Sequence, residues 1–186
     1  GLTFAVETPS DAWQLSLNKE VFKEPEKVME NVDRVTSHIL RKIKAAKEET
    51  VKRTIRLLRT PDNKVLVQDK KYGYYWRAYI FVEQARAYEV LETPEQAFCI
   101  ANAFGEFQQQ LSDLPGDRLH ETIPNFHNTL SRYRDLEKAI QADPKGRVKQ
   151  VMPEIEFVRA RVDRYGMISE ALESGNIPTR ICHNDC

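Results

Sequence analysis

Hydrophobic residues recur every three or four positions from Pro25 onward, and this spacing predicts a helix with one apolar side. The repeating positions are Val28, Val32, Val35, Ile39 and Ile43. Pro25 suits the first turn of a helix, where its missing N–H group would have no partner in any case. Basic residues gather at the far end of this segment, as the helix dipole favours, so we expect a solvated helix end there. They are Arg41, Lys42, Lys44 and Lys47.

Shorter runs of β-forming residues lie on both sides of this helix. Before it, Trp13, Leu15 and Leu17 alternate with polar neighbours, which is typical of a half-buried strand. The runs after it are residues 54–59, 65–68 and 74–82. Turn-forming residues at 61–64 and 70–73 separate these runs. We therefore expect an antiparallel meander, with the aromatic side chains of its last strand packed on one face of the sheet.

The second half of the chain carries the signals of helices. Thr93, Pro94 and Gln96 provide an N-cap, a first-turn proline and a capping-box glutamine, so a helix is predicted from there to just before Pro115. Its apolar face would consist of Ala97, Ile100, Ala101, Phe104 and Leu111. Residues 117–127 are expected to form a loop. Further elements are predicted as helices over residues 129–142 and 153–173 and a short strand over residues 179–182.

This order of elements predicts an α+β fold with two lobes. Strands and one helix come first, a connector follows over residues 83–92, and helices fill the rest. The sheet lobe and its hinge would occupy residues 1–84, and a mainly helical lobe would occupy residues 85–186.

Composition narrows the class of protein. Basic and acidic residues both number 28, so the net charge is zero and no long-range field attracts nucleic acid or an anionic membrane. No apolar run approaches the length that spans a membrane, and the first residues lack the pattern of a signal peptide. The three cysteines are odd in number and irregularly spaced, which indicates a reducing compartment. We expect a cytoplasmic protein that binds neither nucleic acid nor membranes.

The last residues of the chain hold the main candidate for chemistry. Asp185 follows His183 and Asn184 just past the predicted strand at 179–182. A carboxylate at such a place can act as a general base while its neighbours hold the loop. The alternative is an ordinary loop carboxylate. Cys182, His183 and Cys186 also suggest zinc, but a structural zinc site needs a fourth ligand and this spacing matches no common zinc motif.

Other polar candidates have simpler explanations. His120, Glu121 and His127 flank a proline in the 117–127 loop and resemble a metal or acid–base cluster. Histidines in such loops more often cap helices or bond to the backbone, which is the role we expect here. His38, beside the apolar stripe of the first helix, is expected to be structural.

Four segments resemble a known family in their order and spacing. They are residues 18–32 (NKEVFKEPEKVMENV), 75–83 (YWRAYIFVE), 121–129 (ETIPNFHNT) and 181–185 (ICHND). Each is similar to a segment of the bacterial N-acetylhexosamine 1-kinase-like proteins, which belong to the aminoglycoside/choline phosphotransferase superfamily. The resemblance implies a protein-kinase-like fold, in which an antiparallel sheet lobe with one helix precedes a helical lobe. It covers only the N-terminal part of such a protein, so the helical lobe is expected to be truncated.

The resemblance also implies roles for particular residues. Asp185 would be the catalytic base, braced by His183 and Asn184, and the backbone from Phe81 to Glu83 (Phe81, Val82 and Glu83) would bind the adenine of ATP. Family members bind Mg²⁺ through residues that would lie beyond Cys186. Residues 1–12 contain no glycine-rich phosphate loop, and residues 13–17 contain no basic side chain for the phosphates. Glu26 and Glu30 have the position of an acidic residue that orients such a side chain. We expect this chain alone to be a fragment that does not turn over.

The resemblance therefore implies a phosphotransferase, that is, an ATP-dependent kinase for a hydroxyl group of a small sugar. An N-acetylhexosamine is the expected substrate, and an aminoglycoside or a choline-like compound is the nearest alternative. A second class stays open, a non-catalytic kinase-like module that binds a partner protein. Apolar surface left uncovered by the truncated lobe would also favour a homodimer.

Overall fold

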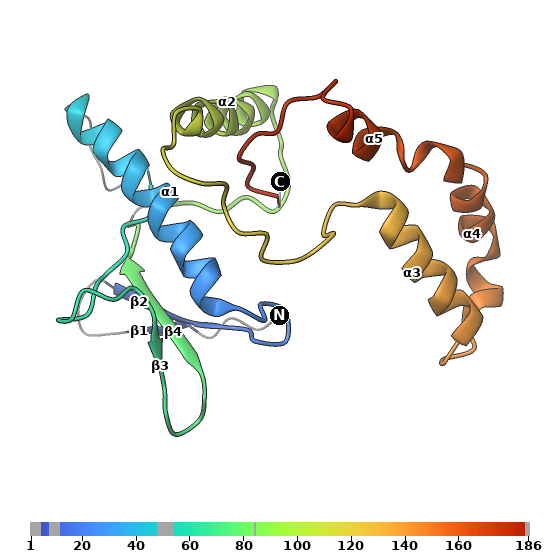
Figure 1. The fold of residues 1–186 in the computed structure, drawn as a ribbon, viewed down its shortest axis with the longest axis horizontal. Coiled ribbons are helices and arrows are strands. Elements are labelled where there is room, and N and C mark those ends of the chain that lie inside the picture. Colours follow the sequence, from blue (N-terminus) through green and yellow to red (C-terminus); the bar gives the residue numbers. More distant parts are fainter. Residues whose placement is uncertain (1–4, 8–11, 48–53, 84, 185–186) are drawn as a thin grey trace. The chain divides into compact units, whose positions relative to one another are not determined.

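The computed structural model describes residues 5–7, 12–47, 54–83 and 85–184. The chain forms two compact units, Gly1–Ile123 and Pro124–Cys186, which are described separately (Figure 1). Asp185 and Cys186, and with them the predicted catalytic carboxylate, lie outside the described residues.

The first unit contains a four-stranded antiparallel sheet. Its strands are β1 (Ala5–Glu7), β2 (Ala12–Leu17), β3 (Val67–Gln68) and β4 (Tyr75–Ile80), in the spatial order β1-β2-β4-β3. Leu15 faces Arg77 and Leu17 faces Tyr75 across β2 and β4, so these four side chains share one face of the sheet.

The prediction of a strand over residues 54–59 is wrong. Within the described residues this segment makes a single bridge, between Leu57 and Tyr79. Leu58 donates to the carbonyl of Ala78 and Arg56 accepts from Ile80, so the pairing covers only three residues. The chain then turns at Thr60, as predicted: Asn63 donates to the Thr60 carbonyl at 2.8 Å, and this ends the ladder.

Helix α1 (Pro25–Ala45) packs on the sheet and supplies most of the core (Figure 1). Leu17, Val28 and Met29 are buried together, and Phe22 and Tyr75 pack around them. The predicted apolar stripe is confirmed. Its members Val28, Ile39 and Ile43 are buried, and Val32 and Val35 are half-buried.

Helix α2 (Pro94–Leu111) begins with the predicted capping box. The Thr93 hydroxyl accepts from the backbone of Gln96, whose side chain accepts from the Thr93 N–H. The predicted apolar face is mostly not buried, because this helix contacts α1 only near its C-terminal end. Leu111 is buried there, whereas Ile100, another member of the predicted face, is 45% exposed.

The second unit consists of short helices. They are α3 (Thr129–Ala142), α4 (Met152–Arg159) and α5 (Met167–Glu173), with 3₁₀ turns at Val148–Val151 and Val162–Arg164. The single helix predicted over 153–173 is therefore wrong. The backbone tightens after α4, Tyr165 donates its hydroxyl to the Val158 carbonyl, and Gly166, a poor helix former, separates the two helices.

The predicted strand at 179–182 is also wrong. In the described residues this segment is irregular, since no neighbouring strand offers it backbone partners. The α+β class is confirmed by the sheet and five α-helices of the described chain. The division into lobes 1–84 and 85–186 stays a prediction. The two compact units of the structure instead divide between residues 123 and 124, because α2 and the segment after it contact α1. None of the described helices is both long and apolar enough to cross a membrane.

Candidate functional site

Polar side chains along one side of α1 hold the chain segment 110–120 against this helix. The residues concerned are Glu30, Asn31, Arg34, His38 and Lys42. Their spacing of three or four residues places them on one face of the helix. Every contact they make here is to a residue at least 68 positions away in the sequence. We call these five residues the polar strip of α1.

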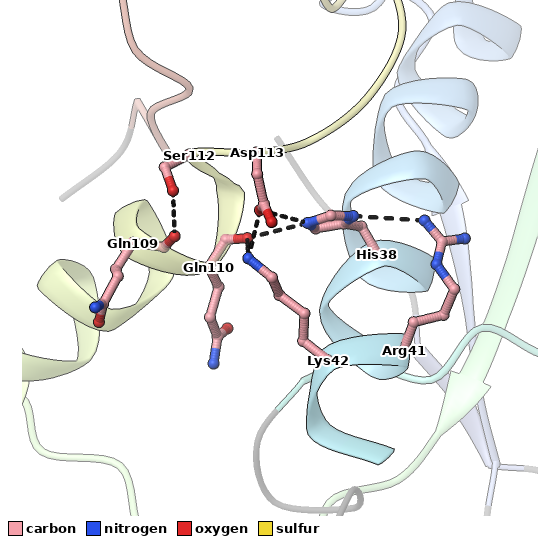
Figure 2. Close-up of polar contacts among 7 residues, drawn as sticks. All are labelled: His38, Arg41, Lys42, Gln109, Gln110, Ser112 and Asp113. Atoms are coloured by element: carbon pink, nitrogen blue, oxygen red, sulfur yellow. Dashed lines mark hydrogen bonds and ion pairs between the residues drawn. The ribbon is translucent and has the colours of Figure 1, made fainter. Parts of the chain in front are cut away.

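At the C-terminal end of the strip, α1 contacts the last turn of α2 (Figure 2). The Nε2 atom of His38 lies 3.1 Å from both the Gln110 carbonyl oxygen and Oδ1 of Asp113. Lys42 donates to the same two acceptors, at 2.8 Å to the carbonyl. Arg41 places Nη2 3.4 Å from Nδ1 of His38. The two α1 donors thus satisfy a carbonyl that the end of α2 would leave open.

Charge and burial differ sharply within this cluster. The His38 residue is only 7% exposed, whereas the Asp113 side chain is 62% exposed. Lys42, and after it His38, lower the pKa of Asp113 by hydrogen bonding to its carboxylate. The cluster is therefore an ion pair at the surface with a buried imidazole beneath it.

In the middle of the strip, Arg34 holds a tight turn. Its Nη2 atom donates to the carbonyl oxygens of Pro115 at 3.3 Å and Asp117 at 2.7 Å. Gly116, between them, has φ 93°, which residues with a side chain rarely adopt.

At the N-terminal end of the strip, α1 binds His120. The Asn31 side chain forms two hydrogen bonds with the His120 backbone, and the Glu30 carboxylate accepts from Nε2 of the His120 ring at 2.8 Å.

These contacts correct some predictions and confirm others. The basic end of α1 is not simply solvated, because Lys42 reaches α2. Glu30 pairs with His120 rather than with a lysine of the sheet. The His38 ring bonds to the backbone carbonyl of Gln110, in keeping with the structural role expected of it. The His120 ring pairs with the Glu30 carboxylate and not with the backbone, which differs from the role expected for the loop histidines. The sequence gives little sign of the strip, since polar residues four apart on a helix also describe a solvated face.

In the second unit, two segments singled out from the sequence come together. His127, in the predicted loop, donates its Nε2–H to the carbonyl oxygen of Asn184 at 2.7 Å. Asn184 has φ 69°, a left-handed conformation that asparagine tolerates. His183 and Asn184 are both exposed. The backbone immediately before Asp185 is thus held by a histidine that sequence analysis treated as a minor candidate.

The predicted hinge residues directly follow β4. Phe81 is 40% exposed, Val82 is half-buried and Glu83 is exposed. Val82 and Glu83 lie beyond the end of β4, so their backbone groups take no part in the described sheet. Such groups suit the edge of an adenine ring, which needs one donor and one acceptor.

Arg77 is a charged residue that sequence analysis missed. It lies on β4, on the face shared with Leu15, and its Nη1 atom is 3.8 Å from the sulfur of Met29 on α1. Its Nε atom is buried and has no hydrogen-bond partner among the described residues, and burial lowers the pKa of the guanidinium. An arginine at an inward position of an otherwise apolar and aromatic face was the available signal.

No metal centre emerges from the described residues, which hold no group of three His, Cys, Asp or Glu side chains able to bind an ion. Cys99 and Cys182 are exposed free thiols.

Comparison with protein-family models found no model that matches this chain.

Proposed function

We propose that this chain is part of an ATP-dependent phosphotransferase that phosphorylates a hydroxyl group of a small sugar, with an N-acetylhexosamine as the preferred class. It would supply the sheet lobe, the adenine-binding segment and the loop that carries the catalytic base. The proposal includes a protein-kinase-like fold and a cytoplasmic location.

The order of the elements supports this proposal. One helix, α1, is inserted between β2 and the two remaining strands and packs on the sheet. The last strand, β4, leads directly into Phe81, Val82 and Glu83. The same layout is what the resemblance of residues 18–32 and 75–83 implies.

The observation that carries the proposal is the bond from His127 to Asn184. A phosphotransferase needs its base at a fixed position beside the attacking hydroxyl, since positioning and charge neutralisation account for most of the catalysis. A hydrogen bond to the residue before Asp185, combined with the left-handed backbone of Asn184, restricts that loop.

The roles of the residues follow from their chemistry. Backbone groups of Val82 and Glu83 would bind the adenine edge. Asp185 would accept the proton of the sugar hydroxyl as its oxygen attacks, and His127 would hold the loop through Asn184. When bound, ATP supplies the phosphoryl group.

The direct test uses the protein expressed from the complete open reading frame. Phosphoryl transfer from ATP is measured over a panel of N-acetylhexosamines, aminoglycosides and choline, with Asp185→Asn and the matched control Asp163→Asn. Asp163 lies in the exposed 3₁₀ turn after α4. We expect sugar-dependent transfer that Asp185→Asn lowers by at least about a hundredfold and Asp163→Asn leaves unchanged. Transfer that survives Asp185→Asn would exclude this carboxylate as the base.

A second pair of variants tests the role of His127. His127→Ala removes the donor to Asn184, whereas His127→Gln retains an N–H donor. The positioning role predicts a lower kcat with little change in the KM for ATP for His127→Ala, and recovery in His127→Gln. Equal losses in both variants would indicate a different role for the ring. If no substrate in the panel is phosphorylated, the non-catalytic binding module becomes the better account.

A further inference from the structure

Arg77 of β4 is a half-buried cation on the α1 side of the sheet. We propose that its guanidinium binds the phosphates of ATP, in place of the basic residue that the neighbouring strand β2 does not provide. Arg77 would then be a substrate-binding residue. This inference rests on the proposed phosphotransferase function, but it concerns how the nucleotide is bound and not whether a sugar is phosphorylated.

The polar contacts of Arg77 within the described chain are poor. Its Nη1 atom lies 3.8 Å from the thioether sulfur of Met29, which is a weak acceptor. Its Nε atom is buried and has no hydrogen-bond partner among the described residues. Glu30, an acidic residue of α1, pairs with His120 instead. Burial lowers the pKa of the guanidinium, so the charge is held there at a cost. Because buried charges in proteins are normally paired, this arrangement favours an anionic ligand.

Other basic residues of the first unit have strong acceptors. Arg59 pairs with Asp33, and Lys42 pairs with Asp113. Arg77 is also the one basic residue within the four strands that the structure describes. An uncompensated cation at a single place in the sheet is therefore a specific feature and not part of a general basic surface.

The position of Arg77 in the sheet suits a bound nucleotide. Arg77 lies directly opposite Leu15 in the middle of β2, a strand whose residues 13–17 contain no basic side chain. Along the chain, Phe81 follows Arg77 by four residues, so an extended backbone places the start of the proposed adenine-binding segment about 13 Å away. An ATP molecule whose adenine is bound by Val82 and Glu83 can thus extend its phosphates along β4 to Arg77.

The chemistry of the guanidinium also matches a phosphate. It carries five N–H donors in a planar fork, which can bond two phosphate oxygens at once. It stays charged where burial lowers its pKa, because the ordinary pKa of arginine is so high. Bound phosphate would supply the negative charge and the acceptors that Met29 cannot.

Binding measurements on the complete protein test this. ATP, adenosine and tripolyphosphate are titrated by calorimetry into wild type, Arg77→Met and the control Lys64→Met. Arg77→Met removes the charge and keeps an unbranched side chain, whereas Lys64 is an exposed cation that already pairs with Asp62. We expect Arg77→Met to raise the Kd of ATP and of tripolyphosphate about tenfold to a hundredfold, as the loss of charge-assisted hydrogen bonds would produce. The Kd of adenosine should change less than about twofold, and Lys64→Met should behave as wild type.

Three results would overturn the proposal: equal losses for ATP and adenosine, an ATP affinity that Arg77→Met leaves unchanged, or a wild type that binds neither ATP nor tripolyphosphate. If Arg77→Met does not fold, the Nε–H resonance of Arg77 in the wild-type chain decides the question. ATP and tripolyphosphate should shift it and adenosine should not, and a resonance that none of them shifts contradicts the proposal. Failure of the proposed kinase activity is seen separately, as ATP binding that depends on Arg77 without any sugar phosphate being formed.

Discussion

Asn31 on α1 and His120, which is 89 residues further along the chain, are joined by two hydrogen bonds between a side chain and a backbone. The Asn31 amide donates to the His120 carbonyl at 2.8 Å and accepts from the His120 N–H at 2.9 Å. The side chain of Asn31 thus satisfies both backbone groups of residue 120, as a neighbouring strand would in a sheet. This pair, with Arg34, His38 and Lys42, explains how a long segment without secondary structure follows the surface of one helix.

Asn31→Ala is expected to destabilise the first unit by about 1–3 kcal/mol, because it leaves a half-buried N–H and C=O without partners. The measurement is the urea midpoint of unfolding. Asn102→Ala is the control, since the exposed Asn102 side chain donates to Glu106 one turn further along α2. An equal shift in both variants would mean that the pair with His120 adds nothing specific.

Two glycine variants should shift stability in opposite directions. Gly116→Ala forces a side chain into a left-handed backbone and places its Cβ 3.2 Å from Nη2 of Arg34, so we expect a loss of about 1–2 kcal/mol. Gly105→Ala lies within α2 with open space around the new Cβ, and should gain about 0.5–1 kcal/mol. Thermal unfolding of the two variants measures both effects. A stabilised Gly116→Ala would contradict the turn described around Arg34.

The ion pair of Asp113 should give a stability difference that depends on pH. The pKa of Asp113 is lowered from 3.8 in the folded state, chiefly by Lys42. The stabilisation is therefore fully present above the unfolded value and is lost as the pH falls through the lower folded value. Asp113→Asn should be less stable than wild type at neutral pH, and the difference should vanish in acid. Asp117→Asn is the control, because Asp117 contributes its main-chain carbonyl to Arg34. A difference that persists in acid would contradict the ion-pair explanation.

In the second unit, Arg159 of α4 and Glu137 of α3 form a two-pronged pair, with both N···O distances at 2.7 Å. Arg159 lowers the pKa of Glu137 through these bonds. Arg159→Lys keeps the positive charge but cannot form both hydrogen bonds to the carboxylate at once, so it should lower the melting temperature of this unit. Lys138→Ala removes only an exposed pair with Asp135 within α3 and should have a smaller effect. The opposite ranking would show that α3 and α4 are held together by other contacts.

Local signals in the sequence were enough to predict two helices: one with a regularly spaced apolar face and one that begins with a capping box. The apolar spacing from Val28 to Ile43 predicts α1, and the pair of Thr93 and Gln96 predicts the start of α2. These signals depend on neighbours within one or two turns. They therefore do not require knowledge of the rest of the fold.

The features that sequence analysis missed depend on contacts that local sequence patterns do not reveal. The break between α4 and α5 includes a hydroxyl bond from Tyr165 to the Val158 carbonyl, which helical spacing does not reveal. Residues 54–59 have the composition of a strand but find only a short stretch of β4 to pair with. Arg77 belongs to a sheet face whose orientation is known only once β2 lies beside β4. The candidate base, Asp185, could be named from its motif, but the support from His127 could not.

The most direct measurement of the central proposal is ³¹P NMR of the complete protein with ATP and an N-acetylhexosamine. The account predicts that ADP and a sugar phosphate appear together in equal amounts, with the new phosphate on the anomeric oxygen, and that both form at least about a hundredfold more slowly with Asp185→Asn. ATP that remains intact with every sugar, or that is hydrolysed without forming a sugar phosphate, would contradict it.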